Sequence, residues 1–161
     1  MHSRADMAAA SVHGDHPKPA VRIARLKALA ARHGLRMTPQ RAVLLAVLGR
    51  MSHHPTADEL YRLVRKVLPS ISPATVYRNV QTLVRARVIT TLERAGDALR
   101  YDPNPDEHHH FICSRCGRVL DVYLSSVAYR FDAPGSGLRG AQIESCEVQL
   151  RGVCPRCRGR G

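Results

Sequence analysis

Two matched Cys-x-x-Cys pairs constrain this chain of 161 residues more than any other feature of its sequence. The first pair is Cys113 and Cys116, directly followed by Gly117, and the second is Cys154 and Cys157. Each pair can present two thiolates on one tight turn, and a tetrahedral all-thiolate metal site needs two such turns. Soft thiolates in a closed site favour a structural Zn²⁺, although iron in a rubredoxin-like site has the same spacing. Two unrelated pairs or a redox dithiol are the alternatives without a structural metal.

Positive charge is the second constraint, because the formal net charge of the chain is +12 at neutral pH. The charge is concentrated in two stretches, residues 21–41 and 62–87, which each carry six Lys or Arg and no acid. A basic surface of this kind predicts an acidic partner, with nucleic acid ahead of an anionic membrane.

The sequence gives no sign of a membrane segment or of export. It has no apolar run long enough to span a bilayer, and its N-terminus lacks the continuous apolar segment of a signal peptide. We therefore expect a cytoplasmic protein without a membrane partner. In that reducing compartment, five cysteines indicate metal or redox chemistry rather than a disulfide framework.

Three capping residues mark helix starts in the first half of the chain. Thr38 and Ser72 each precede a proline at the first helical position. Thr56 and Glu59 have the spacing of a capping box. The predicted elements are a flexible tail over residues 1–20, helices over 21–34, 39–50, 57–68 and 73–86, and two short strands within 88–102.

This order of elements predicts an α+β fold that begins with a winged helix-turn-helix DNA-binding domain over residues 21–103, with the hairpin as the wing. The helix over 73–86 is the candidate for the major groove, because its outer face is polar and basic. The side chains expected on that face are Thr75, Tyr77, Arg78, Gln81, Thr82 and Arg85.

Residues 104–161 predict a second, small α/β domain that would carry the four-cysteine site. Strands are expected over 108–113, 117–124 and 141–154, with a short helix or loop over 125–140. A sheet with so few strands has exposed edges, and pairing of two copies in a dimer would cover them. Cys146 stands within the last expected strand, where a small buried thiol is its expected identity.

A histidine run directly before the first cysteine pair predicts a second metal site. His108 and His110 are two residues apart, so in a strand both point to one face while His109 points to the other. With the carboxylate of Asp121 they would form half of a site suited to Fe²⁺, Mn²⁺ or Zn²⁺.

Two residues of the first half lie at places from which they could join such a site. Asp102 stands at the end of the wing, just before the histidine strand, and His54 stands in the loop before the helix over 57–68. A lone histidine is more often a surface or core residue than a ligand. The residues alone therefore do not assign His54.

The chain resembles the Fur family of bacterial metal-dependent repressors over about residues 21–157. The resemblance rests on "LRMTPQR", "HPTADELY", "SPATVYRNVQTL", "RYD", "HHHFICSRCG" and "CPRC". It implies a homodimeric transcriptional repressor, with a winged helix that binds double-stranded DNA at an AT-rich palindromic operator and a C-terminal dimerisation domain. It also implies a structural zinc ion at Cys113, Cys116, Cys154 and Cys157 and a regulatory metal at His54, Asp102, His108, His110 and Asp121.

Within that family, the acids of the regulatory site indicate the stimulus. Iron sensors usually have Glu where this chain has Asp102 and Asp121, whereas peroxide sensors usually have Asp at both positions. Zinc sensors generally place a Cys near the wing end, and no Cys precedes Cys113 here. The resemblance therefore favours a peroxide sensor of the PerR type holding Fe²⁺ or Mn²⁺, in which His54 or His108 would be oxidised. An iron-responsive repressor of metal uptake genes is the alternative.

The resemblance does not imply a third metal site. Glu107 and His109 could contribute to the additional site that the family often carries, but Ala128 stands where an acid is expected. Cys146 likewise stands where histidines are common.

We expect the DNA contacts to be divided among three roles. Tyr77 and Arg78 are expected to contact bases or methyl groups, Arg36 the minor groove, and Arg41 and Arg85 phosphates. The competing classes are a zinc enzyme and a zinc-ribbon interaction module. The zinc-protease motif HExxH and the deaminase pattern are both missing from the sequence, so we expect no enzyme.

Overall fold

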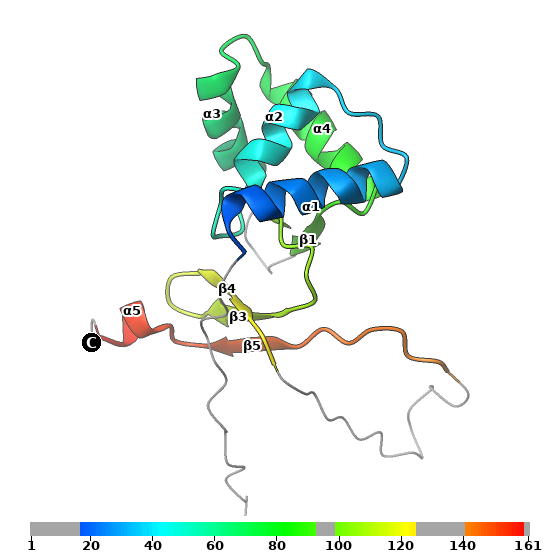
Figure 1. The fold of residues 1–161 in the computed structure, drawn as a ribbon. Helices are drawn as coiled ribbons and strands as arrows, with labels where there is room; N and C mark the ends of the chain where they lie inside the picture. Colours follow the sequence, from blue (N-terminus) through cyan, green and yellow to red (C-terminus); the bar gives the residue numbers. More distant parts are fainter. Residues whose placement is uncertain (1–16, 93–98, 125–140, 160–161) are drawn as a thin grey trace, which may run out of the picture. The chain divides into compact units, whose positions relative to one another are not determined.

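A computed structural model describes residues 17–92, 99–124 and 141–159 of the chain, and it divides them into two compact units (Figure 1). One unit holds the described residues up to Asp106, and the other holds those from Glu107 onward. Helices dominate the first unit and a small sheet dominates the second. The structure therefore confirms the predicted α+β fold.

Four helices form the first unit, and their starts follow local capping chemistry. They are α1 (Pro19–Arg32), α2 (Pro39–Leu48), α3 (Ala57–Val67) and α4 (Pro73–Arg85). The side chains of Thr38 and Ser72 accept the backbone N–H of the third residue after each, and Thr56 and Glu59 form the expected reciprocal capping box. Helix α1 begins two residues inside the segment expected to be a flexible tail. It ends at Arg32, two residues before the predicted end at Gly34, which has a φ of 67°.

The core of this unit is a cluster of sixteen buried hydrophobic residues. Helix α2 contributes the buried side chains of Leu44, Leu45, Val47 and Leu48, while Val43 is only partly buried. Leu60 and Val64 face it from α3, and Val80 is among the residues that face it from α4. A core of this size fixes α4 against α2 and α3 and leaves its opposite side to solvent.

The predicted wing is an antiparallel hairpin that ends at a candidate metal ligand. Strand β1 (Thr90–Leu92) pairs with β2 (Arg100–Asp102), with Thr91 opposite Tyr101. The predicted turn of this hairpin lies outside the described residues. The pairing places Asp102 at the last position of β2.

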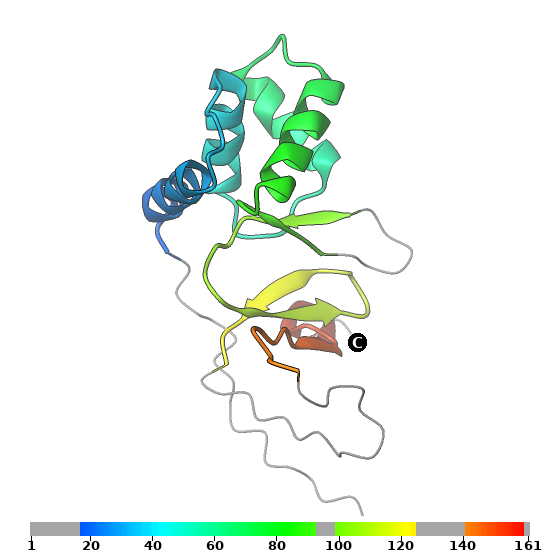
Figure 2. The same cartoon turned by 90° about the vertical axis from the view of Figure 1, so that its right-hand side faces the viewer.

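The second unit contains a three-stranded sheet with β3 in the middle (Figures 1 and 2). Strand β3 (His109–Cys113) pairs antiparallel with β4 (Val119–Val122) and parallel with β5 (Gln149–Gly152), and the short helix α5 (Pro155–Arg158) follows. The expected helix or loop over 125–140 lies outside the described residues. The parallel pairing brings the end of the chain beside the strand that carries the histidines.

The prediction for Cys146 is wrong. It was expected to be a buried thiol within a strand over 141–154, but only 149–152 of that segment forms a strand. Cys146 lies in irregular backbone before β5 and is partly exposed. The apolar residues Ile143 and Leu150, which suggested burial, are themselves exposed in this unit.

Among the described residues, none of the helices combines the length and the apolar character that crossing a membrane requires.

Candidate metal centres and nucleic-acid interface

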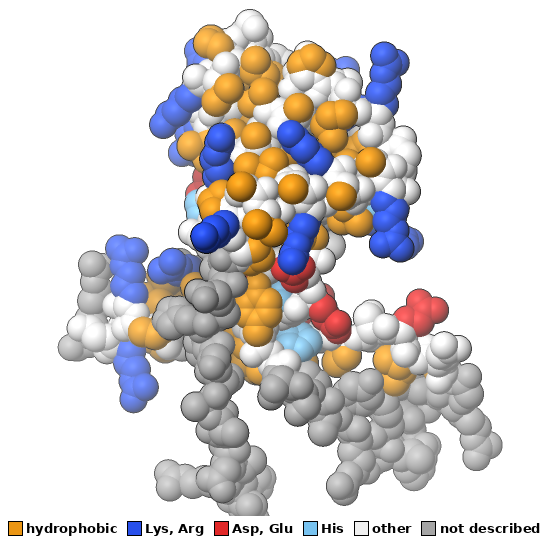
Figure 3. Space-filling view, in the orientation of Figure 1, with side chains coloured by type: hydrophobic (Ala, Val, Ile, Leu, Met, Phe, Trp, Pro, Cys, Tyr) orange, Lys and Arg blue, Asp and Glu red, His pale blue; other side chains and the backbone are white. Residues whose placement is uncertain are grey.

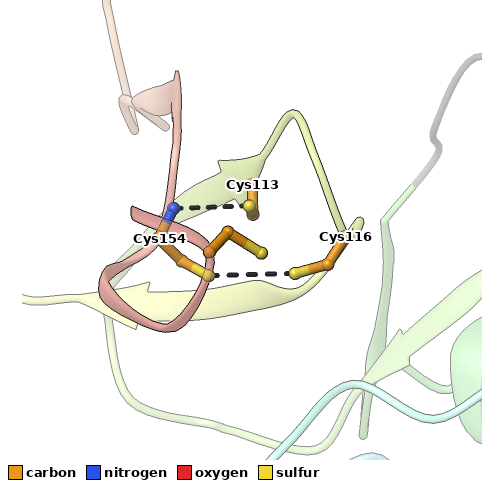
Figure 4. Close-up of side chains that lie close together, drawn as sticks. Cys113, Cys116 and Cys154 are labelled. Atoms are coloured by element: carbon orange, nitrogen blue, oxygen red, sulfur yellow. Dashed lines mark hydrogen bonds between the residues drawn. The ribbon is translucent and has the colours of Figure 1, made fainter. Parts of the chain in front are cut away.

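The four cysteines of the two pairs lie together in the second unit. Their sulfur atoms all lie within 4.8 Å of one another, and the Sγ atoms of Cys116 and Cys154 are 3.8 Å apart (Figure 4). A zinc–sulfur bond of about 2.3 Å in a regular tetrahedron puts neighbouring sulfur atoms about 3.8 Å apart. The spacing and the all-thiolate donor set therefore fit a structural Zn²⁺.

Backbone hydrogen bonds shape both turns of this site. The first turn follows β3 and closes with the N–H of Gly117 donating to the carbonyl of Cys113 at 2.9 Å, while Gly117 takes a φ of 73° that suits glycine. In the second turn, the N–H of Cys157 donates to the carbonyl of Cys154 at 2.9 Å. The two turns are joined because the N–H of Cys154 donates to Cys113 Sγ at 3.3 Å.

The thiols of the site differ in acidity before a metal is added. The pKa of Cys113 is lowered to about 6, chiefly because the backbone N–H of Cys154 donates to its sulfur. The pKa of Cys157 is raised to about 12, chiefly because of its hydrogen bond with the Cys116 side chain. Deprotonating all four thiols at neutral pH therefore requires a cation, so that metal binding must release protons.

The second unit also gathers three of the predicted regulatory ligands. The Nε2 atoms of His108 and His110 are 2.9 Å apart, and Asp121 Oδ2 lies 3.9 Å from His108 Nε2. The antiparallel register places His110 directly opposite Asp121. Two imidazole nitrogens bound to one ion at about 2.1 Å and at right angles would be about 3.0 Å apart. The observed spacing and the nitrogen and oxygen donors therefore fit an ion such as Fe²⁺, Mn²⁺ or Zn²⁺.

Glu147 and His109 make contacts beside this cluster that the sequence did not predict. Glu147 Oε1 lies 3.0 Å from His110 Nδ1, and the N–H of Val148 donates to His109 Nδ1 at 3.3 Å. Both contacts arise from the parallel pairing of β3 with β5, which the sequence pattern does not reveal. His109 thus helps to fix the chain beside β3, on the side of the strand predicted to face away from His108.

The remaining two predicted ligands lie together in the first unit. His54 Nε2 is 3.6 Å from Asp102 Oδ1. The loop that carries His54 is tied to β2, because Arg100 Nη1 donates to the His54 carbonyl at 2.8 Å and the N–H of Tyr101 donates to the Pro55 carbonyl at 2.9 Å. The first unit therefore fixes the His54 imidazole and the Asp102 carboxylate relative to each other.

Helix α4 exposes the polar face that was predicted to meet DNA. Tyr77, Arg78, Gln81 and Arg85 are exposed, whereas Thr75 and Thr82 are partly buried. Lys and Arg side chains are spread over the face of the first unit seen in Figure 3. A cationic surface with an exposed helix is the arrangement expected of a DNA-binding unit.

Several side chains of this surface already have partners within the unit. The hydroxyl of Tyr77 donates to Asp58 Oδ1 in α3 at 2.6 Å, and this hydrogen bond raises the pKa of Tyr77. Arg41 Nη1 donates to the carbonyl of Arg36 at 2.7 Å, which braces the loop before α2. The ring of Tyr77, rather than its bound hydroxyl, is therefore the part available for apolar contact.

Comparisons with known proteins give a consistent result. Residues 32–151 match the sequence model of the Ferric uptake regulator family. The peroxide-responsive repressor PerR of Staphylococcus epidermidis is 29% identical over 128 residues, which cover 80% of this chain and 85% of that protein. A zinc-bound manganese uptake regulator is 31% identical, with 81% of this chain and 98% of that one covered and a TM-score of 0.57. The Campylobacter jejuni peroxide stress regulator is 26% identical, with 84% and 98% covered and the same TM-score.

Proposed function

We propose that this chain, which belongs to the ferric uptake regulator family, is a metal-dependent transcriptional repressor that binds an AT-rich palindromic operator as a homodimer. A structural Zn²⁺ at the four cysteines would stabilise the second unit. A second, exchangeable ion would control DNA binding. Its proposed ligands are His54, Asp102, His108, His110 and Asp121.

One observation carries the proposal of a regulatory ion. His108 and His110 present their Nε2 atoms 2.9 Å apart beside Asp121, in a unit that already has a separate thiolate site. The two sites offer different donors, so that Zn²⁺ can remain with the thiolates while a harder ion exchanges at the imidazoles. A zinc-ribbon interaction module that does not sense a metal needs only the thiolate site, so the second donor set favours a sensor.

The proposed ion would act on orientation, because its ligands belong to two units. His54 and Asp102 come from the first unit and the other three ligands from the second. An ion bound by all five would favour one relative orientation of the units over the others. In a homodimer, that orientation would set two copies of α4 about one DNA turn, roughly 34 Å, apart.

On the DNA, we propose that Tyr77 and Arg78 contact base edges or methyl groups. Arg36 would enter the minor groove, and Arg41 and Arg85 would contact phosphates. Exposure of α4 and the basic surface of the first unit support this assignment.

We propose peroxide as the stimulus, with Fe²⁺ as the reactive ion and Mn²⁺ as an unreactive substitute. Support comes from the aspartates at 102 and 121 and from the similarity to proteins named as peroxide regulators. With Fe²⁺ bound as the catalyst, one peroxide oxygen would be transferred to a C–H bond of an imidazole and the other would leave as water, so that the imidazole is the group oxidised. After dilute peroxide, mass spectrometry of the Fe²⁺-loaded protein should show about 16 Da, one oxygen atom, added to His54 or His108. Unmodified histidines would instead favour an iron-responsive repressor of metal uptake genes.

A titration of the zinc-loaded full-length protein tests the function itself. A duplex is first selected from a random library with the Mn²⁺-loaded protein, and its affinity is then measured by fluorescence anisotropy with and without Mn²⁺. We expect one further equivalent of Mn²⁺ to bind per chain and to raise DNA affinity by about 5–150-fold.

Two variants make this titration specific. His54→Ala should lose the gain in DNA affinity, whereas His53→Ala, at the exposed neighbouring position, should keep it. Equal DNA affinity with and without Mn²⁺ in the wild-type protein would contradict the proposal.

A further inference from the structure

Glu147 is a carboxylate beside the regulatory histidines that has no place in the ligand set proposed above. Its Oε1 atom lies 3.0 Å from His110 Nδ1, which is the ring nitrogen opposite the one that approaches His108. The side chain of Glu147 is 60% exposed, while that of His110 is 4% exposed. The exposed carboxylate of Glu147 thus contacts Nδ1 of the buried His110 imidazole.

The backbone explains why this contact forms. Strand β5 runs parallel to β3 with Gln149 paired to His110, and the N–H of His110 donates to the Val148 carbonyl at 3.1 Å. These contacts fix the two residues that directly follow Glu147. The carboxylate therefore reaches His110 by strand register rather than by a chance surface encounter.

A neutral imidazole carries one proton, and the position of that proton decides which nitrogen can bind a metal. A carboxylate next to Nδ1 favours the tautomer in which Nδ1–H donates to it. The lone pair is then on Nε2, the nitrogen that lies 2.9 Å from His108 Nε2. The carboxylate also increases the basicity of the ring, which strengthens metal ligation.

We propose that Glu147 is a positioning residue for the regulatory metal: it holds the proton of His110 on Nδ1 and thereby presents Nε2 to the ion. This inference rests on the proposed function, because it concerns the same ion. The residue comes from the segment just before β5. This segment would then influence the affinity of the regulatory site for its metal. Glu147 itself would not ligate the metal.

The test uses the zinc-loaded full-length protein and three variants. Glu147→Ala removes the acceptor, and Glu147→Gln keeps an acceptor oxygen without its charge. Glu144→Gln removes the charge of an exposed acid three residues away and serves as the control. Long-range ¹H–¹⁵N spectra of the histidine rings report the His110 tautomer without added metal. Electron paramagnetic resonance then measures the affinity of the zinc-loaded protein for Mn²⁺.

We expect the wild-type protein to hold His110 with Nδ1 protonated and Glu147→Ala to lose that preference. Its affinity for Mn²⁺ should fall by about 10–100-fold, as loss of such a partner commonly causes. Glu147→Gln should keep the tautomer and have an intermediate affinity, and Glu144→Gln should match the wild type.

Three results would overturn the inference. The first is an unchanged His110 tautomer in Glu147→Ala, and the second is an Mn²⁺ affinity within twofold of wild type. The third is a loss of affinity without a change of tautomer, which would make Glu147 a direct ligand. If the zinc-loaded wild-type protein binds no Mn²⁺, the proposed function fails, while the tautomer measurement still decides whether Glu147 sets the proton of His110.

Discussion

Removing the thiolate site should unfold one unit of this protein and leave the other folded. The second unit buries few apolar side chains: among its described residues, the aliphatic ones are Ile112, Val119 and Val122. Fully burying each contributes about 1.5–3 kcal/mol, or about 5–9 kcal/mol for the three. Binding of a structural Zn²⁺ is worth about 10–16 kcal/mol at neutral pH. The ion is therefore the larger stabilising contribution to this unit.

The first unit has no such dependence, because its core contains sixteen buried hydrophobic residues from α1 to β2. Cys116→Ser is the suitable change, since serine is similar in size but is a poor zinc ligand. We expect this variant to lose one equivalent of zinc. Its amides in β3, β4 and β5 should lose protection from hydrogen exchange, while those of α2, α3 and α4 keep it.

Hydrogen exchange read by mass spectrometry at peptide level measures both units in one experiment, alongside the zinc content. The matched control is Cys146→Ser, because Cys146 is not among the four clustered cysteines. It should retain zinc and wild-type protection. The reasoning is refuted if Cys116→Ser lacks zinc and β3, β4 and β5 nevertheless exchange as slowly as in the wild type.

Four further predictions concern the DNA surface and the half of the regulatory site that lies in the first unit. Asp58→Ala and Tyr77→Phe each remove the hydrogen bond between these two side chains, so both should weaken operator binding by similar factors. The double variant should bind the operator no more weakly than either single variant. Additive losses of affinity in anisotropy titrations would contradict this. That bond raises the pKa of Tyr77 and is lost as the pH rises through that pKa, so Asp58→Asn should move the ultraviolet titration of Tyr77 down toward its usual value. Arg100→Met should weaken binding of Mn²⁺ while helix content by circular dichroism is preserved, since the His54 carbonyl loses its donor; unchanged affinity in calorimetry would exclude that role. Arg78→Ala should cost about 1–3 kcal/mol of operator binding if it reads a base, and unchanged discrimination against scrambled DNA would show that it does not.

The features that sequence predicted well are those determined by neighbours along the chain. Thr38, Thr56 and Ser72 cap helices because a capping hydroxyl needs only the backbone three residues further on. The clustering of the four cysteines was also predicted, because each Cys-x-x-Cys turn supplies two sulfurs and a tetrahedral ion takes four. The approach of His108 to His110 was predicted from the two-residue period of extended backbone, although β3 itself begins at His109.

The features that sequence missed depend on pairing between distant segments. Glu147 reaches His110 only because β5 runs parallel to β3. No turn motif or residue spacing in the sequence predicts the register between these two strands. Cys146 was expected to be buried in a strand, but regular pairing begins three residues later. Tyr77 was correctly expected on the exposed face of α4, whereas its bond to Asp58 required the angle between α3 and α4.

Each half of the proposed regulatory site is organised within its own unit, and this bears on how an ion could control the protein. In the first unit, Arg100 ties the His54 loop to β2, and Asp102 Oδ1 accepts the N–H of Asn104 at 2.8 Å. Beyond it, Asp106 pairs with Arg25 of α1, so that the chain leaving the wing is also fastened. Ligands that are already ordered lose little conformational entropy on binding. Most of the binding free energy of the proposed ion would then remain available to select one orientation of the two units, which is the quantity that a metal-dependent repressor has to control.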